Sequence, residues 1–390
     1  KLNNNNNIVI DTGENNVGAY VTGDSIFNNK GSIKLGTATG TNLINAIGIY
    51  VAAGEAVNTT GKTIEIYDRN NVAGSSLSVG MLAKANTGAT ATIKNAGNIN
   101  VNGEAVGMNI DDNSTGSNSG TITAKENNNL KAIGAYVNGA NAKFTNTGTI
   151  SADNIALALK STTATKIANS GTLKLTKTGA VGVYADDSIV DFNIAPTVAT
   201  GADGTVALYA TGNTKIKSQI TSVTGKSHIG VYAEGNAEFQ SGSKVIVGNG
   251  IGNDYGIGIY TKAGYNKAIT SNIDLNGAET IGLYLGNDTV SSTGSTVNHT
   301  GTINVGSGIG VFIPQHSKFV AQNTTFNVNG GTAVYLKGGE VDLGSTGTAT
   351  INFTGTGGRG IFQDGGTITT GSGLNIVGSG SFLTLKNANS

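Results

Sequence analysis

The stretch Tyr255–Tyr260 reads YGIGIY, and its last four residues, Ile257–Tyr260, return along the whole chain. The mean spacing of the fourth position, from residue 20 to residue 362 in thirteen steps, is 342/13, about 26 residues. A repeat of this length predicts a solenoid, in which similar turns stack on one another. Aligning the chain on this motif gives fourteen copies: VGAY17–20, IGIY47–50, VGML79–82, VGMN106–109, IGAY133–136, IALA155–158, VGVY181–184, VALY206–209, IGVY229–232, IGIY257–260, IGLY281–284, IGVF309–312, TAVY332–335 and RGIF359–362.

The four columns of this alignment are chemically sorted. The first is Val or Ile in twelve of fourteen copies, the second is always Gly or Ala, the third is always apolar, and the fourth is Tyr or Phe in eleven. The residue after the motif is often apolar too, and apolar residues at positions one, three and five predict a strand whose inner face they form. In the YGIGIY copy, Ile257 and Ile259 are then expected to face the core. Gly258 and Tyr260 are expected to face outward, with the ring lying over the exposed glycine backbone.

Each repeat holds two further strand signals. After Tyr136, the sequence VNGANAKFTNTGTISAD contains a turn, a short alternating run and a third run that begins at TIS. Asn146 and Asn169 precede recurring glycines, and both residue types tolerate the positive φ of a tight corner. Similar Gly-Thr-Ile elements start at Gly31, Gly120, Gly148, Gly171 and Gly301.

Three short strands per repeat predict an all-β fold, a right-handed parallel β-helix of about 14–15 coils of roughly 26 residues. Stacked at about 4.8 Å, such coils would form a rod about 70 Å long. Propeller blades need about 40–50 residues per repeat, and leucine-rich repeats need helical segments and a Leu/Asn consensus. We expect residues 1–390 to be one continuous segment of a longer rod, without a signal peptide or a membrane barrel.

The composition narrows the class of protein. Glycine accounts for 60 of 390 residues, the formal net charge is zero, and cysteine is absent. The dispersed Lys and Arg argue against a nucleic-acid partner, which requires a concentrated basic patch. The absence of Cys excludes a disulfide framework and thiolate chemistry. No apolar run approaches the roughly 20 residues of a membrane helix, so we expect no membrane insertion by this segment.

The glycine-rich, Asn/Thr/Ser-rich repeats of the N-x-G-T-I and [VI]-G-[VILA]-Y type resemble the passenger domains of autotransporters (type V secretion). They are most similar to the large fusobacterial-type autotransporter adhesins. The resemblance spans the chain and implies an extracellular location at the bacterial cell surface, with the passenger continuous with a C-terminal barrel in the outer membrane. It also implies a role in adhesion or coaggregation. The implied partners are a host-cell receptor protein or glycan, or the surface of another bacterium.

Two groups of residues are candidates for binding. An exposed aromatic column could meet a partner, because Tyr is enriched at interfaces, or could only brace the rod by stacking of successive rings. Its members are Tyr184, Tyr209, Tyr232, Tyr260, Tyr284, Phe312 and Tyr335. Longer connections form the second group, because extra residues in solenoids map to loops that often bind. The candidate loop residues are Tyr67, Asp68, Arg69, Tyr265 and His316.

Catalytic chemistry has weak support in the sequence. Asp111-Asp112 and Asp186-Asp187 are the acid pairs that a carbohydrate-active enzyme would need, but they lie three repeats apart and read as turn residues. The three histidines, His228, His299 and His316, are too scattered for a transition-metal site. We therefore predict no catalytic residue, metal or cofactor. The primary expectation is an adhesin segment that displays a binding surface, and the alternatives are a structural stalk and, further off, a carbohydrate-active enzyme or a toxin passenger.

Overall fold

The computed structural model describes residues 1–37, 43–68, 77–127, 129–163, 166–222, 224–252 and 254–386. The described part is all-β and divides into two compact units. Unit 1 comprises residues 1–192 and 196–202, and unit 2 comprises residues 193–195 and 203–390. No helix in the described part is long and apolar enough to span a membrane. The prediction of a single continuous segment stays a prediction.

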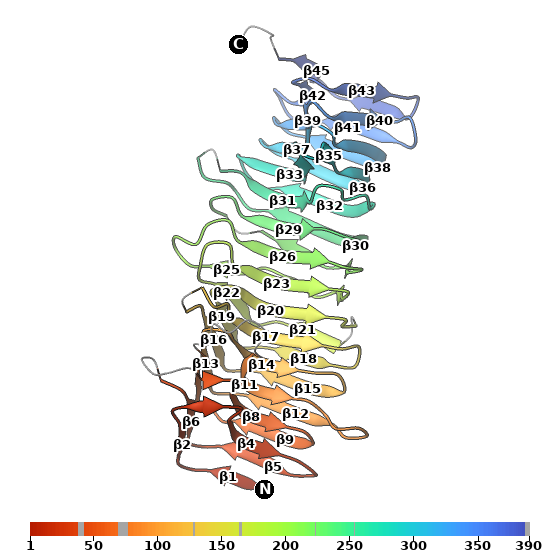
Figure 1. The fold of residues 1–390 in the computed structure, drawn as a ribbon. Helices are drawn as coiled ribbons and strands as arrows, with labels where there is room; N and C mark the ends of the chain where they lie inside the picture. The colour runs from red at the N-terminus through yellow and green to blue at the C-terminus, as the bar shows by residue number, and fades with distance from the viewer. Residues whose placement is uncertain are drawn as a thin grey trace. The chain divides into compact units, whose positions relative to one another are not determined.

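Unit 1 is a β-solenoid whose described turns each contribute one strand to each of three parallel sheets, apart from local exceptions (Figure 1). The first sheet contains β1 (Leu2–Asn4), β5 (Ile26–Asn29), β9 (Gly54–Asn58), β12 (Ala91–Asn95), β15 (Ser114–Asn118), β18 (Lys143–Asn146) and β21 (Ile167–Asn169). The second contains β2 (Asn7–Ile10), β6 (Ser32–Leu35), β10 (Thr63–Tyr67), β13 (Asn98–Asn102), β16 (Thr121–Lys125), β19 (Thr149–Ala152), β22 (Thr172–Leu175) and β25 (Thr197–Val198).

The third sheet of unit 1 carries the motif strands. They are β4 (Val17–Val21), β8 (Ile47–Val51), β11 (Ser78–Ala83), β14 (Ala105–Ile110), β17 (Ile133–Asn138), β20 (Ile155–Lys160) and β23 (Val181–Asp186). Short strands β3 (Gly13–Glu14) and β7 (Leu43–Ile44) pair with each other, and β24 (Ile189–Val190) follows β23. Equivalent residues of successive turns pair in parallel, as Ile122 does with Ile99 and Ile150. The predicted parallel β-solenoid and its three strands per turn are therefore confirmed in unit 1.

Unit 2 keeps the motif sheet but joins the other two sheets. Its described motif strands are β26 (Val206–Thr211), β29 (Ile229–Ala233), β31 (Gly256–Thr261), β33 (Thr280–Leu285), β37 (Ile309–Pro314), β39 (Thr332–Lys337), β42 (Arg359–Gln363) and β45 (Ser381–Leu385). The joined sheet contains β27 (Lys215–Ile216), β28 (Gln219–Thr221), β30 (Glu238–Val247), β32 (Ile269–Leu275), β36 (Thr296–Val305), β38 (Lys318–Val328), β40 (Glu340–Leu343), β41 (Ala349–Phe353), β43 (Thr367–Thr370) and β44 (Leu374–Val377).

The joined strands bend where the corner of unit 1 would lie. Gly242, Gly301 and Asn323 have positive φ angles of 92°, 135° and 62° inside β30, β36 and β38. The pairing register shifts at two places: β30 has two extra residues relative to β32 between Phe239 and Ser243, and β38 has one extra residue relative to β36 between Ala321 and Thr324. Three separate strands per turn were expected throughout. The long strands β30, β36 and β38 correct that expectation locally, whereas the turns with β27 and β28, β40 and β41, and β43 and β44 keep separate strands.

The core of each unit is formed by the inward-facing side chains of its strands. In unit 1, Ile64, Ile99, Ile122 and Ile150 are fully buried and stack in register. Burying a side chain of this size contributes about 1.5–3 kcal/mol relative to its exposure. Because each turn buries its apolar residues only against its neighbours, stability accumulates along the stack.

A column of asparagines, buried except at its two ends, runs through the first sheet of unit 1. Each side-chain Nδ2 except that of the last member donates to the Oδ1 of the asparagine in the next turn, at 2.7 to 2.9 Å. The members are Asn4, Asn29, Asn58, Asn95, Asn118, Asn146 and Asn169, called here the asparagine ladder. The prediction that Asn146 and Asn169 adopt positive φ is wrong: neither has a positive φ, and both belong to this ladder.

The corner glycines also have a different role from the expected one. Gly120, Gly148 and Gly171 have no positive φ. A Cβ on Gly148 would lie 2.1 Å from the backbone oxygen of Gly120, and a Cβ on Gly171 would lie 2.1 Å from that of Gly148. Glycine is therefore required here because the corners of successive turns approach too closely for a side chain. Gly301, at φ 135°, is the corner glycine that meets the original expectation.

Candidate binding surfaces

The motif strand presents its first and fourth residues on the outer face. In unit 1, Val79, Leu82 and Val106 pack with Ile47, Tyr50, Ile133 and Tyr136, a cluster that contains only first and fourth positions. Third and fifth positions, such as Met108 and Ile110, are fully buried. The predicted orientation is confirmed for positions three, four and five. It is wrong for position one, which lies beside the ring.

The second position of the motif faces inward, as the third and fifth positions do. A Cβ on Gly107 would lie 2.5 Å from both the Gly134 backbone oxygen and the Cγ2 atom of the buried Ile122. Gly258 is equally confined, with Gly282 O at 2.5 Å and a Val247 methyl at 2.7 Å. Two consecutive residues therefore point into the core, which the alternation of an ideal strand does not allow. The expectation that Gly258 faces outward under Tyr260 is wrong, because its missing side chain makes room for the core and the next turn.

Unit 2 contains an uninterrupted column of stacked rings. Its successive ring centroids lie 4.7 to 5.3 Å apart, and the first four pairs are nearly parallel. The members are Tyr209, Tyr232, Tyr260, Tyr284, Phe312, Tyr335 and Phe362, called here the ring ladder. Each favourable pair contributes about 0.5–1.5 kcal/mol beyond its area burial. The remaining predicted residue, Tyr184, is half-buried in unit 1, where it pairs in register with Ala158.

The ring ladder offers ring edges to the surface because the ring faces cover one another. The rings are half-buried, and this burial raises the pKa of the Tyr232, Tyr260 and Tyr284 hydroxyls. Flat stacking of a sugar on an inner ring is therefore blocked by the neighbouring turns. A partner would meet hydroxyls and ring edges at the spacing of the turns.

A groove of about 690 Å³ lies where the motif strands of unit 2 pass into their turns. The rings of Tyr284 and Phe312 contribute its aromatic part, while Lys337 and Asp364 contribute opposite charges. The antiparallel pair β34 (Asn287–Asp288) and β35 (Thr293–Gly294) forms a hairpin at the same level. The other lining residues are Asn287, Thr289, Pro314, Gln315, Gly338, Gly365 and Gly366. We call this set the ladder-end groove because it lies at the C-terminal ends of the motif strands, beside the middle of the ring ladder. It brings two predicted ladder residues together with turn residues that the sequence analysis did not single out.

The predicted loop residues lie in dissimilar places. Tyr265 is 2% exposed and donates a hydrogen bond to the Ala237 backbone oxygen at 2.8 Å, so it is a core residue whose pKa burial raises strongly. Asp68, also 2% exposed, accepts a hydrogen bond from the Ser78 hydroxyl. Neither side chain lies on the surface expected of a binding loop.

The other loop candidates are more accessible. The hydroxyl of Tyr67 donates to Glu65 at 2.7 Å, and the Lys34 ammonium lies 5.8 Å from the Tyr67 ring centroid. His316 is exposed in a turn, at φ 67°. Arg69 lies outside the described residues.

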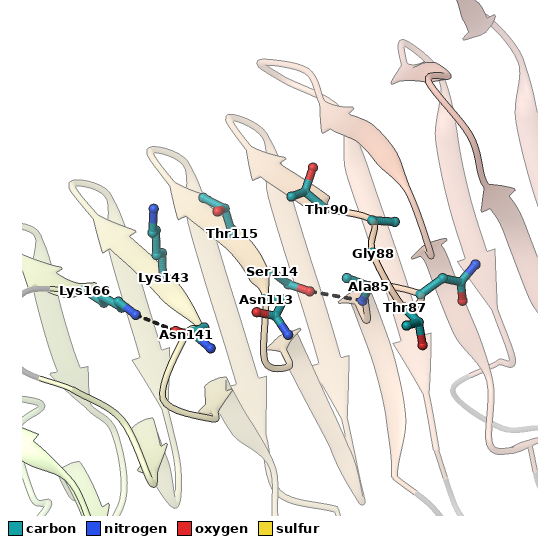
Figure 2. Close-up of a pocket in the computed structure, with 12 residues that line it drawn as sticks. Ala85, Thr87, Gly88, Thr90, Asn113, Ser114, Thr115, Asn141, Lys143 and Lys166 are labelled. Carbon is teal, nitrogen blue, oxygen red and sulfur yellow. Dashed lines mark hydrogen bonds between the residues drawn. The ribbon is translucent and has the colours of Figure 1, made fainter.

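A second hollow, the polar pocket of about 680 Å³, lies in unit 1 where motif strands turn into the first sheet (Figure 2). The longer turn before β12 forms one side, and shorter turns of the next repeats form the rest. The lining residues are Ala85, Asn86, Thr87, Gly88, Ala89, Thr90, Asn113, Ser114, Thr115, Asn141, Lys143 and Lys166. They come from four successive turns, so no local motif marks them in the sequence.

The acidic residues considered for catalysis have local partners. Asp112 accepts a hydrogen bond from the Asn141 backbone amide at 2.6 Å, and Asp111 lies 4.0 Å from the Lys84 ammonium. Asp186 forms an ion pair with Lys160, and Asp187 occupies a turn at φ 50°. These contacts assign the four acids to turns and to bonds between turns.

The two buried histidines are held by interior hydrogen bonds. Nδ1 of His228 lies 2.8 Å from the Thr205 hydroxyl. In His299, Nδ1 lies 3.1 Å from the Thr324 hydroxyl and Nε2 lies 3.1 Å from the Ser271 backbone oxygen. Burial lowers the pKa of both residues, to about 4 for His299. The described residues contain no group of three or more His, Cys, Asp or Glu placed to hold a metal ion.

Comparison with models of known protein families finds no match to this chain, and a search of curated proteins finds none either.

Proposed function

We propose that this chain is a non-enzymatic segment of a bacterial cell-surface adhesin, in which stacked turns display a binding surface. The observation that carries the proposal is the ladder-end groove. It combines half-buried rings with amide, ammonium and carboxylate groups on a strand scaffold. Aromatic anchors surrounded by polar groups are typical of binding sites for proteins and small molecules. The repeat motifs that resemble autotransporter passengers give independent support.

The proposed partners are a receptor protein or glycan on host cells, or the surface of another bacterium. The test measures binding of the purified, folded chain to host cells and to partner bacteria. In the groove, Gln315→Ala and Lys337→Ala should reduce binding at unchanged thermal stability, since both side chains lie at the surface. Lys215→Ala, at an exposed position on β27, is the matched control and should bind as the unaltered chain does. Equal binding by all three variants would overturn the assignment of the groove.

A second pair of variants separates a binding role of the rings from a bracing role. Tyr284 belongs to the ring ladder and lines the groove, while Tyr232 belongs to the ring ladder alone. Tyr284→Leu and Tyr232→Leu should destabilise the chain similarly, because each loses two stacked neighbours. Only Tyr284→Leu should reduce binding further than its stability loss explains. Equal binding losses would leave the rings with a bracing role only.

A structural stalk is the second candidate function. The observation in its favour is that the ring faces of the ring ladder cover one another. Such stacking joins successive turns, whereas a site that stacks on a ligand requires an exposed ring face. A folded chain that binds neither host cells nor bacteria would support the stalk and refute the adhesin proposal.

A further inference from the structure

The polar pocket of unit 1 combines two lysines with a dense set of neutral hydrogen-bonding groups. Thr87, Thr90 and Thr115 contribute hydroxyls, and Asn113 and Asn141 contribute amides. No carboxylate is among its lining residues. Figure 2 shows these side chains on neighbouring turns, where the bond between Ser114 Oγ and the Ala85 backbone amide joins two sides of the pocket at 3.2 Å.

The two lysines are placed one turn apart. Lys143 is the first residue of β18, and Phe144 pairs in register with Ile167, so Lys166 lies one turn along from Lys143. Nζ of Lys166 donates to the Ala140 backbone oxygen and to Asn141 Oδ1, both at 2.9 Å. Both acceptors are neutral, so these bonds orient the ammonium group without cancelling its charge. Like charges on adjacent strands disfavour folding, and a bound anion would relieve this repulsion.

Other lysines in the described chain show how this arrangement differs. Lys160 and Lys318 each form an ion pair with an acid at the register-matched position of the next turn, Asp186 and Glu340 respectively. In the pocket, the position of the next turn that matches Lys143 in register is occupied by Lys166 and not by an acid. The carboxylate of Asp112, adjacent in sequence to Asn113, accepts hydrogen bonds from the Asn141 backbone amide and the Asn113 side chain. Among the described residues, no carboxylate forms an ion pair with Lys143 or Lys166, so both ammonium groups are available to a ligand.

We propose that the polar pocket binds a carboxylated pyranose, with its carboxylate at Lys143 and Lys166 and its hydroxyls at the threonine and asparagine side chains. Hydroxyls and amides both donate and accept, which suits the several hydroxyls of a sugar ring. The volume falls in the range of small-molecule sites. This inference goes beyond the proposed function by giving unit 1 a ligand class of its own, and it does not depend on the ladder-end groove.

The test measures binding of the whole chain to two acidic probes by calorimetry, trigalacturonic acid for uronic-acid polysaccharides and 3′-sialyllactose for sialylated glycans. Their neutral counterparts are the methyl ester of trigalacturonic acid and lactose. We expect at least one acidic probe to bind at least tenfold more tightly than its neutral counterpart. Lys143→Gln should weaken that binding at least tenfold. Added salt should weaken it further, because the charges are partly exposed.

Lys174→Gln is the matched control, since Lys174 is an exposed strand lysine of unit 1 outside the pocket. It should bind the acidic probe as the unaltered chain does, and so should the groove variant Lys337→Ala. A failed groove and a failed pocket are thereby distinguished. The proposal is overturned if neither acidic probe binds, if acid and neutral probes bind equally, or if Lys143→Gln has no effect. Equal competition by inorganic sulfate would also refute it, by reducing the pocket to a simple anion patch.

Discussion

Gly107 shows how one missing side chain permits a turn of the solenoid to close on the next. The space that its Cβ would need is taken by the Gly134 backbone oxygen and an Ile122 methyl, each at 2.5 Å. Backbone on one side and a packed core on the other leave little room to relax. The conservative composition of the second motif column, always Gly or Ala, follows from this confinement.

We therefore expect Gly107→Val to destabilise unit 1 by about 3 kcal/mol, the upper end of the usual cost of overpacking. Ser117→Val adds a β-branched side chain on the outer face of β15 and should change the free energy of unfolding by less than about 0.5 kcal/mol. Urea denaturation followed by circular dichroism measures both. Equal denaturation midpoints for the two variants would show that the close approach at Gly107 does not determine the stability of unit 1.

His299 predicts a dependence of stability on pH. Its pKa is lowered to about 4 in the folded chain, while an unfolded histidine has a pKa of about 6.5. Between these pH values the unfolded chain binds a proton that the folded chain does not. The free energy of unfolding therefore falls as the pH drops from about 6.5 to 4. Above pH 6.5, the contribution of His299 to the free energy of unfolding does not change with pH. The full loss is about 3 kcal/mol, from 1.36 kcal/mol per pKa unit.

The measurement is the free energy of unfolding at several pH values for the unaltered chain and for His299→Gln. The variant should lose most of this slope and keep the smaller part due to His228, whose pKa burial also lowers. An unchanged slope in the variant would place the titrating group elsewhere.

The asparagine ladder shows what one polar column does for a whole sheet. In the middle of it, Asn118 accepts a hydrogen bond from Asn95 and donates one to Asn146, each at 2.8 Å. All three side chains are buried. Because buried amides need partners, the column favours the single register in which every asparagine meets another.

Asn118→Ala should destabilise unit 1 by about 2 to 4 kcal/mol, since it leaves polar groups of two neighbours unsatisfied and opens a cavity. Asn98→Ala, on the exposed face of β13, should cost less than about 0.5 kcal/mol. Thermal unfolding of the two variants provides the comparison. A similar small loss for both would mean that water replaces the missing amide.

The strands themselves were predictable, because a turn must bury an apolar set at a fixed period. The orientation of the motif was not, since Gly107 and Met108 both point inward and glycine has no side chain to reveal its direction. Asn146 was assigned to a corner because asparagine suits both a positive φ and an amide ladder. The joined strands of unit 2 depend on bends at Gly242 and Gly301, and glycine also marks ordinary turns.

Across each unit, the candidate surfaces depend on what successive turns bring together. The ring ladder was visible in the sequence because its members share one motif column. The polar pocket was not, because Thr87, Asn113 and Lys166 come from different turns and occupy no common column. In a solenoid, a pocket lined by several turns therefore leaves no local sequence pattern, whereas a column of equivalent residues does.

The parallel pairing of successive turns also has a mechanical consequence. Within a unit, the ladder bonds that join strands such as β16 and β19 run from one turn to the next. A pull on the two chain ends of a unit would load these bonds a turn at a time, because the turns bond to their neighbours. Each detached turn would release about 26 residues, roughly 90 Å of extended chain. Single-molecule stretching should record a series of similar small extensions, and one abrupt rupture would contradict this. Such a unit would yield gradually under tension, dissipating work at each step while the remaining turns stay folded.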